Sequence, residues 1–351
     1  ARAFRPGAGL RGHQRVGPRV SSVLYLAWRY LLWHRWKTAI LVGAVTLVMY
    51  LPLGLQTLIQ QTATDMTARA DSTPLLLGRR GSPLELVLNS LYFSPEHPQP
   101  LSYADFLSLR NEPGILPVPL YVRFQSQGVP IVGTTLDYFD FRGLSIGAGR
   151  QMTNLGEAVL GAEAARSLGV GPGDAILSSP ESVFDIAGVY PLKMQVAGVL
   201  QHAYSQDDRA IFVDLKTAWI IGGLGHGHQD LQSREAAGAV LKTEGERIVA
   251  NASLVQYNEI TPENIDSFHF HGERENLPLT AVLPVPADKK RGVLLLGRYQ
   301  SDDTLQMLEP SAVIDQLLAT VFRVQRYVLA AMALVGVATA AVALLVLSLS
   351  W

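Results

Sequence analysis

The chain has 351 residues, of which 48% are hydrophobic and 17% are charged, and its formal net charge is −1. It contains no cysteine, which excludes zinc and iron–sulfur sites built on cysteine and every thiol-based mechanism. The net charge hides a strong segregation, because residues 1–37 hold eight Arg and Lys and no acid, whereas all 30 acids lie between Asp65 and Asp315.

Residues 1–20 are rich in Arg and Gly and are predicted to form a disordered cytoplasmic tail. The sequence does not begin with Met, so we expect its natural start to lie upstream. Residues 21–37 combine three tryptophans with basic residues and no acid, which is typical of an amphipathic helix along the cytoplasmic face of a membrane. Alternatively, these residues are the first turns of the membrane-spanning helix that follows.

An uncharged run begins at Thr38, and we predict a transmembrane helix over residues 38–59, since about 20 apolar residues cross a hydrocarbon core of about 30 Å. Its basic N-terminal flank predicts a cytoplasmic N-terminus and an outer location for the acidic region. A cleaved signal peptide is the alternative, with Ala68-Arg69-Ala70 as its cleavage site, but the apolar run is longer than such peptides have. Residues 60–70 are predicted to continue the helix outward as a stalk.

Short strands alternate with single helices between residues 72 and 310, a pattern typical of an α+β domain. We predict helices over residues 84–91, 103–110 and 163–168. We predict strands over residues 118–124, 129–134, 158–160, 175–177, 183–189, 194–199, 210–214 and 280–285. Residues 222–232 and 258–276 are predicted to be loops.

Residues 311–326 place apolar side chains on one stripe at helical spacing: Ile314, Leu317, Leu318, Val321 and Phe322. We predict a second stalk helix that packs against the first; the alternative is that the stripe belongs to the core of the outer domain. Residues 327–349 carry no charge and are predicted to form the second transmembrane helix.

Small residues in this second span have the spacing that allows close helix packing, with Gly336 and Ala340 as its centre. This spacing favours a homodimer or a close contact with another membrane helix, and the alternative is an ordinary alanine-rich span.

Catalytic signatures are missing from the sequence. It has no G-x-x-x-x-G-K-[ST] phosphate loop and no G-x-S-x-G nucleophile motif. We therefore expect no enzyme and no catalytic or cofactor-binding residue in this chain.

Two His-x-His pairs are the candidate ligand set of the outer region: His226 with His228, and His269 with His271. In an extended strand, residues i and i+2 share a face, so His269 and His271 could reach one ion while Phe268 and Phe270 point the other way. Imidazole ligands suit Zn²⁺ or another transition metal. The alternative is a solvated polar loop.

Between residues 129 and 200 the chain carries a series of spaced motifs. They are G-x-x-x-x-Y-F ending at Tyr138-Phe139, a glycine-rich segment closed by Arg150, V-L-G-x-x-x-A around Gly161, L-G at Leu168-Gly169, and G-D-x-I at Gly173-Asp174. In this order between two spans, the series resembles the extracytoplasmic core of the MacB/FtsX-like ABC transporter permeases, the mechanotransmission class.

The resemblance implies an α+β extracytoplasmic domain on two transmembrane helices with stalk extensions. It implies a porter-like lobe of residues 72–142 and 278–310 and an inserted second lobe of residues 143–277. Members typically have four spans, so we expect the sequence to be a fragment, with further spans and the coupling loop after Trp351.

The resemblance also implies a function in the bacterial inner membrane. The permease subunit would couple a separate cytoplasmic ATPase, which binds and hydrolyses the ATP, to movements of the periplasmic domain for export or extraction of a substrate. Its partners would be that ATP-binding subunit, the lipid bilayer, a second permease copy and a periplasmic protein, but no nucleic acid. The rival hypothesis is a two-span membrane sensor whose outer domain is a binding module, in one version responsive to metal.

Overall fold

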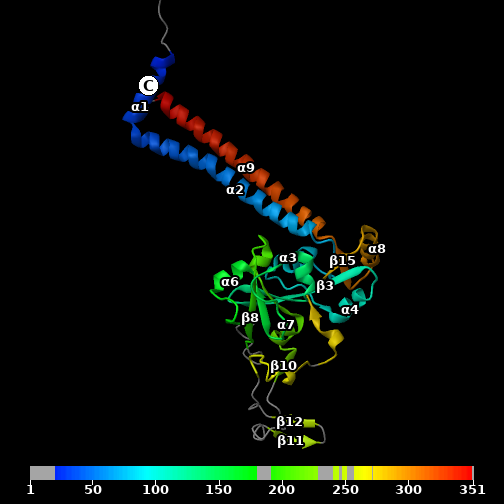
Figure 1. Ribbon diagram of the computed structural model, residues 1–351. Helices are drawn as coiled ribbons and strands as arrows, with labels where there is room; N and C mark the ends of the chain where they lie inside the picture. Colours follow the sequence, from blue (N-terminus) through cyan, green and yellow to red (C-terminus); the bar gives the residue numbers. More distant parts are fainter. Residues whose placement is uncertain are drawn as a thin grey trace, which may run out of the picture. The chain divides into compact units, whose positions relative to one another are not determined.

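The computed structural model describes residues 20–179, 191–227, 240–244, 247–250, 257–270 and 272–349 (Figure 1). The chain divides into two compact units, one made of Ala1–Gln61 and Val321–Trp351, the other of Thr62–Thr320. Residues 1–19 of the predicted tail and the predicted strand at 183–189 lie outside the described residues.

Helices make up the described part of the first unit. Helix α1 (Val20–Trp33) ends at a turn at His34, and α2 (Arg35–Asp71) runs through Pro52 into the second unit. Helix α9 (Pro310–Leu349) likewise belongs to both units. Each predicted span thus forms one continuous helix with its predicted stalk.

Hydropathy supports one of the two predicted spans. Among the described residues, one helical segment, Pro310–Val342, is long and apolar enough to cross a membrane, with a mean hydropathy of 1.5. The predicted first span over residues 38–59 is not shown by this test and stays a prediction.

The second unit is built on a ten-stranded mixed sheet, in the order β16–β1–β15–β3–β4–β9–β6–β8–β5, with β7 also paired to β8. The strands are β1 (Leu76–Arg79), β3 (Ile115–Ser126), β4 (Val129–Thr134), β5 (Ile146–Gly149), β6 (Glu157–Leu160), β7 (Ala175–Leu177), β8 (Lys193–Leu200), β9 (Ile211–Asp214), β15 (Ala281–Pro286) and β16 (Leu305–Leu308). The β4–β9 and β6–β8 pairs are parallel and the others antiparallel, which confirms the predicted α+β class.

Three two-stranded sheets complete the described β-structure: β2 (Leu101–Ser102) with β14 (Pro278–Leu279), β10 (Gly225–Gly227) with β13 (Phe268–Phe270), and β11 (Val240–Glu244) with β12 (Arg247–Ala250). Short 3₁₀ turns are η1 (Gln206–Arg209), η3 (Ile265–Ser267) and η4 (Arg274–Asn276).

Strand β3 joins the two halves of the large sheet. Its residues 115–120 pair with β15 and its residues 121–126 pair with β4. The sheet therefore contains strands from both predicted lobes, and the division into lobes stays a prediction.

Both faces of the large sheet are buried, because successive apolar residues alternate between two cores. The first core includes Leu77, Tyr121 and Ile211 and is covered by α4 (Tyr103–Arg110), α7 (Leu215–Ile221) and α8 (Lys289–Tyr299). The second core includes Leu76, Leu120 and Phe212 and is covered by α3 (Pro83–Tyr92) and α5 (Asp137–Arg142). Helices α6 (Ala162–Leu168) and α8 lie at opposite ends of the sheet (Figure 1).

Most predicted elements are confirmed within three residues, and the predicted helix 103–110 and strand 175–177 agree at both ends. The loop prediction was wrong at two places, where β10 and β13 form a strand pair. Strand β10 is Gly-His-Gly and has no apolar residue, so hydrophobic alternation could not indicate it.

Close packing explains why the V-L-G-x-x-x-A motif has a glycine at position 161. A Cβ atom at this position would lie 2.2 Å from the carbonyl oxygen of Asp207 and 2.4 Å from the backbone of Asp208. The junction between β6 and α6 can therefore pack against η1 only if residue 161 has no side chain.

We predict that Gly161→Ala destabilises the chain by about 1–3 kcal/mol, the usual range for overpacking. Gly171→Ala is the matched control, because its Cβ would come no closer than 4.0 Å to a neighbouring atom. It should change stability by no more than about 0.5 kcal/mol. Chemical denaturation in detergent, followed by tryptophan fluorescence, measures both. Equal effects of the two substitutions would contradict the proposed close approach.

Candidate functional site

A buried ion pair holds the end of α2 inside the second unit. Arg69, in the last turn of α2, donates from Nη1 to Asp207 Oδ2 at 2.7 Å and from Nη2 to Asp207 Oδ1 at 2.9 Å. The side chains of Arg69 and Asp207 are only 7% and 2% exposed. Two parallel bonds between a planar guanidinium and a carboxylate fix orientation as well as distance.

Tyr138 and the chain around it complete the partners of this pair. The Tyr138 hydroxyl accepts from Arg69 Nη2 at 2.9 Å and donates to Asp207 Oδ1 at 2.6 Å. Arg69 Nε donates to the Leu91 carbonyl at the end of α3, and its guanidinium lies 5.3 Å from the centre of the Phe93 ring. We call Arg69, Tyr138 and Asp207 the α2 anchor.

The protonation states of the anchor follow from its surroundings. Burial and the Asp207 carboxylate raise the pKa of Tyr138 to about 12, so the hydroxyl keeps its proton and donates it. Burial alone would raise the pKa of Asp207, but the charge and hydrogen bonds of Arg69 and the Tyr138 hydroxyl outweigh it and lower this pKa. Asp207 is therefore an anion paired with a cation.

Arg142 holds the C-terminal end of α2 from the other side. Its Nη1 and Nη2 donate to the hydroxyls of Ser72 at 3.0 Å and Thr73 at 2.9 Å. These two hydroxyls donate to the Arg69 carbonyl at 2.8 and 3.0 Å. The two hydroxyls thus satisfy the Arg69 carbonyl in the last turn of α2, where carbonyls lack helical partners, and the Arg142 cation lies at the favourable C-terminal end of the helix.

The start of α9 is fixed to the same face of the sheet by apolar contact. Ile314 is fully buried in the second core, and Leu317 and Leu318 pack against that core. The end of α2 contributes the fully buried Ala70 to this core. The alternative interpretation of the stripe, packing on the outer domain, is therefore confirmed for these three residues of α9. We call residues 62–71 of α2 and 310–320 of α9 the feet of the two helices.

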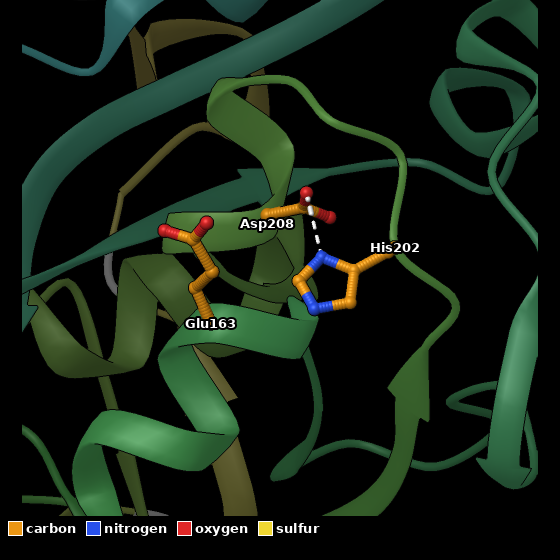
Figure 2. Close-up of side chains that lie close together, drawn as sticks. All are labelled: Glu163, His202 and Asp208. Atoms are coloured by element: carbon orange, nitrogen blue, oxygen red, sulfur yellow. Dashed lines mark hydrogen bonds and ion pairs between the residues drawn. The ribbon is translucent and has the colours of Figure 1, made fainter.

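Among the described residues, one group of three His, Asp and Glu side chains has ligand-type atoms within 4.8 Å of one another: Glu163, His202 and Asp208. Figure 2 shows the three converging, Glu163 from α6, Asp208 from η1 and His202 from the loop after β8. His202 Nδ1 lies 3.2 Å from Asp208 Oδ2.

Neighbouring arginines extend this group into a hydrogen-bonded network that includes one ion pair, Arg209–Glu163. Arg166 Nη2 lies 3.0 Å from His202 Nε2, and because arginine only donates, Nε2 accepts and Nδ1 donates to Asp208. Arg209 Nε donates to Glu163 at 2.6 Å. Both ring nitrogens are engaged, so we interpret the group as holding η1, the turn that carries Asp207.

Asp208 also ties down the chain that precedes η1. Its carboxylate accepts from the backbone N–H groups of Ala203 at 2.9 Å and Tyr204 at 2.8 Å. Adjacent acids of one turn thus serve two purposes: Asp208 orders its own loop and Asp207 binds α2.

The glycine-rich motif ends in a second ion pair. Arg150 donates to both carboxylate oxygens of Glu157, at 2.7 and 2.5 Å. Glu157 also accepts from the backbone N–H groups of Thr153 at 2.9 Å and Asn154 at 3.2 Å. The Arg150 bond is the largest cause that lowers the pKa of Glu157 to about 2.

The predicted metal ligands are brought together in part. His226 and His269 face each other across the β10–β13 pair. His228 and His271 lie outside the described residues. Phe268 and Phe270 pack against the first core.

Sequence reasoning missed Arg69 and Asp207. The one sequence pattern around Arg69 is Ala68-Arg69-Ala70, which resembles a signal-peptide cleavage site. Asp207 lies in an Asp-Asp-Arg turn that contains no motif residue. The two are 138 residues apart, and nothing local indicates that they pair.

Residues 38–253, more than half of the chain, match the family of MacB-like periplasmic core domains. The chain belongs to this family, which confirms its resemblance to the MacB/FtsX-like ABC transporter permeases. The family consists of inner-membrane permease components with a periplasmic domain and implies a cytoplasmic ATP-binding partner.

Solved structures give weaker similarities. The extracellular domain of the noncanonical ABC-type transporter YknZ from Gram-positive bacteria is 14% identical, with 67% of this chain and 98% of that chain covered and a TM-score of 0.36. The periplasmic region of MacB from Actinobacillus actinomycetemcomitans is 12% identical, with 70% and 92% covered and a TM-score of 0.37. No curated protein matches the chain. The family assignment rests on the sequence match and not on these structural similarities.

We predict that Arg69→Met costs about 3–5 kcal/mol of folding free energy, because it leaves Asp207 charged and buried without its partner. The double variant Arg69→Met/Asp207→Asn should recover part of that loss, since removing both charges also removes the uncompensated one. Denaturation of the chain in detergent measures the free energies.

Lys193→Met is the matched control, since the Lys193–Glu259 pair is partly exposed, at 41% and 28%. It should cost no more than about 1 kcal/mol. The single variant Asp207→Asn completes the comparison. If the double variant lost as much stability as the two single variants added together, Arg69 and Asp207 would not act as a pair.

Acid should weaken the second unit through Glu157. Folding lowers the pKa of the Glu157 carboxyl from its ordinary value of 4.5 to about 2. The ionised carboxylate therefore stabilises the fold fully at pH values above 4.5, and this contribution is lost as the pH falls to about 2. We predict that stability falls less between pH 4.5 and pH 2 in Glu157→Gln than in the unmodified chain. Arg150→Gln should likewise reduce the fall in stability between pH 4.5 and pH 2. An unchanged pH profile in both variants would rule out this contribution.

Proposed function

We propose that this chain is the part of an ABC transporter permease that passes movement from a separate cytoplasmic ATP-binding subunit to a periplasmic domain, for export or extraction of a substrate. The observation that carries the proposal is the fixation of both helix feet on one core. Arg69 and Ala70 of α2 and Ile314 of α9 are all buried in the second unit.

Continuity of the helices supports this proposal. Helix α2 is helical from Arg35 to Asp71 and α9 from Pro310 to Leu349. A displacement applied along such a helix reaches its foot without passing through a loop, and a foot held by a buried ion pair moves with its domain. Coupling through rigid elements and packed side chains is how motion crosses long distances in proteins.

Two observations support a separate ATP-binding subunit. The chain has no phosphate-loop motif, and its family implies an ATP-binding subunit in the cytoplasm. We propose that two permease copies pair in the membrane, in line with the spacing of Gly336 and Ala340 in α9. A periplasmic partner protein also belongs to this proposal.

The test uses distances between spin labels. Since the chain has no cysteine, Lys216→Cys on α7, which is exposed, would be the labelling site that this chain contributes to each permease copy. The full permease and its ATP-binding subunit are reconstituted in nanodiscs with every copy labelled, so that the distance between the second units of two paired copies is measured. We predict that this distance distribution shifts when ATP binds.

Two variants test whether the change in distance requires the ion pair of the α2 foot. Arg69→Met should reduce the change, because the α2 foot loses its ion pair, whereas Arg150→Gln, which removes an ion pair elsewhere in the second unit, should leave it unaffected. If ATP causes no shift in the unmodified permease, the proposed coupling is wrong.

A further inference from the structure

The β10–β13 pair is held in a fixed register by the residues of its inner face. Gly225 lies opposite Phe270 and Gly227 opposite Phe268. A Cβ atom at Gly225 would lie 2.7 Å from the Phe270 ring, and one at Gly227 would lie 2.6 Å from the Phe268 ring. The two glycines therefore leave the space that the two rings fill.

This inner face is attached to the core of the second unit. Phe268 and Phe270 pack against the first core, and Phe270 makes an edge-to-face contact with the buried Trp219, at a centroid distance of 6.1 Å. A slip of one residue would turn both rings away from the core, so burial of the rings specifies the register.

The same register brings two histidines together on the outer face. His226 lies directly opposite His269, and their ring centroids are 4.9 Å apart at an interplanar angle of 67°. His226 is half-buried and His269 is exposed. The position of the imidazoles is therefore set by packing on the other face of the strands, while solvent reaches the pair.

A hydrogen bond selects the tautomer of His269. Its Nδ1 lies 3.0 Å from the carbonyl oxygen of Ser267, and a carbonyl can only accept, so Nδ1 carries the proton and Nε2 the lone pair. Histidines that bind metals usually donate their other ring N–H to a carbonyl or carboxylate in this way.

We propose that His226 and His269 form a two-histidine binding site for a divalent transition-metal ion, with Zn²⁺ as the ion that the site takes. Neutral imidazole nitrogens are preferred ligands of Zn²⁺, and two protein ligands leave further positions for water or for another ligand. This inference does not depend on the proposed transport function, since it concerns only the outer face of one strand pair.

The test is zinc binding by the purified chain. The chain, without a histidine tag, is treated with a chelator in detergent, dialysed and titrated calorimetrically with ZnCl₂. We expect one Zn²⁺ per chain. His226→Ala and His269→Ala should each weaken Zn²⁺ binding by at least about tenfold. Removing a residue that only hydrogen-bonds to a metal ligand already weakens binding by about this much, and here the ligand itself is removed. The affinity of the double variant for Zn²⁺ should be only slightly lower than that of either single variant, because both residues bind the same ion.

Two controls locate the site. His97→Ala removes an exposed histidine elsewhere and should leave binding unchanged. His202→Ala removes the histidine of the Glu163 group and should also leave it unchanged. Loss of binding in His202→Ala with binding kept in His226→Ala/His269→Ala would overturn the proposal, as would equal binding by the unmodified chain and this double variant.

Spectroscopy with a second ion identifies the ligands independently of folding. Cu²⁺ added to the unmodified chain should give an electron paramagnetic resonance spectrum with splitting from two nitrogen atoms, which His226→Gln/His269→Gln should lack. Circular dichroism of the metal-free variants checks that they are folded. A spectrum unchanged by this substitution would overturn the proposal.

Discussion

One buried ion pair, between Arg69 of α2 and Asp207 of η1, fixes the end of α2 in the second unit. The desolvation penalty of two buried charges offsets much of their electrostatic attraction, so such a pair contributes less to stability than its geometry suggests. We infer that its main effect is to fix where α2 ends, because a cation 7% exposed has few other places where its donors are satisfied. Its partners come from α3, α5 and η1, so the α2 foot is tied to three elements together.

The remaining contacts hold the parts of the α2 anchor in place. Gly161 lets η1 approach the junction of β6 and α6, and Asp208 orders the loop that leads into η1. Arg142 closes the end of α2 through Ser72 and Thr73. The α9 foot is attached to the same core through Ile314, by apolar contact instead of charge. Both feet therefore belong to one packed body, and the proposed coupling is based on this arrangement.

The sequence predicted what depends on local pattern. The apolar run of α9 and the strand-like segments of β3, β8 and β15 indicated the right elements, and the spaced motifs indicated the family. Long-range pairing was invisible: Arg69 and Asp207 are far apart in sequence, and an arginine between alanines carries no sign of burial. Strand β10 was predicted as a loop because its glycines serve the Phe rings of β13 and have no hydrophobic period of their own. For the predicted metal site, the sequence supplied the residue types, but only the register could place His226 opposite His269.

Hydrogen–deuterium exchange of the α2 foot tests the central claim most directly. If the anchor joins α2 to the sheet, the amides of residues 66–71 should exchange as slowly as those of β9, and Arg69→Met should speed their exchange while the sheet stays protected. Exchange of these amides as fast as that of a frayed helix end in the unmodified chain, with no change on Arg69→Met, would contradict the account.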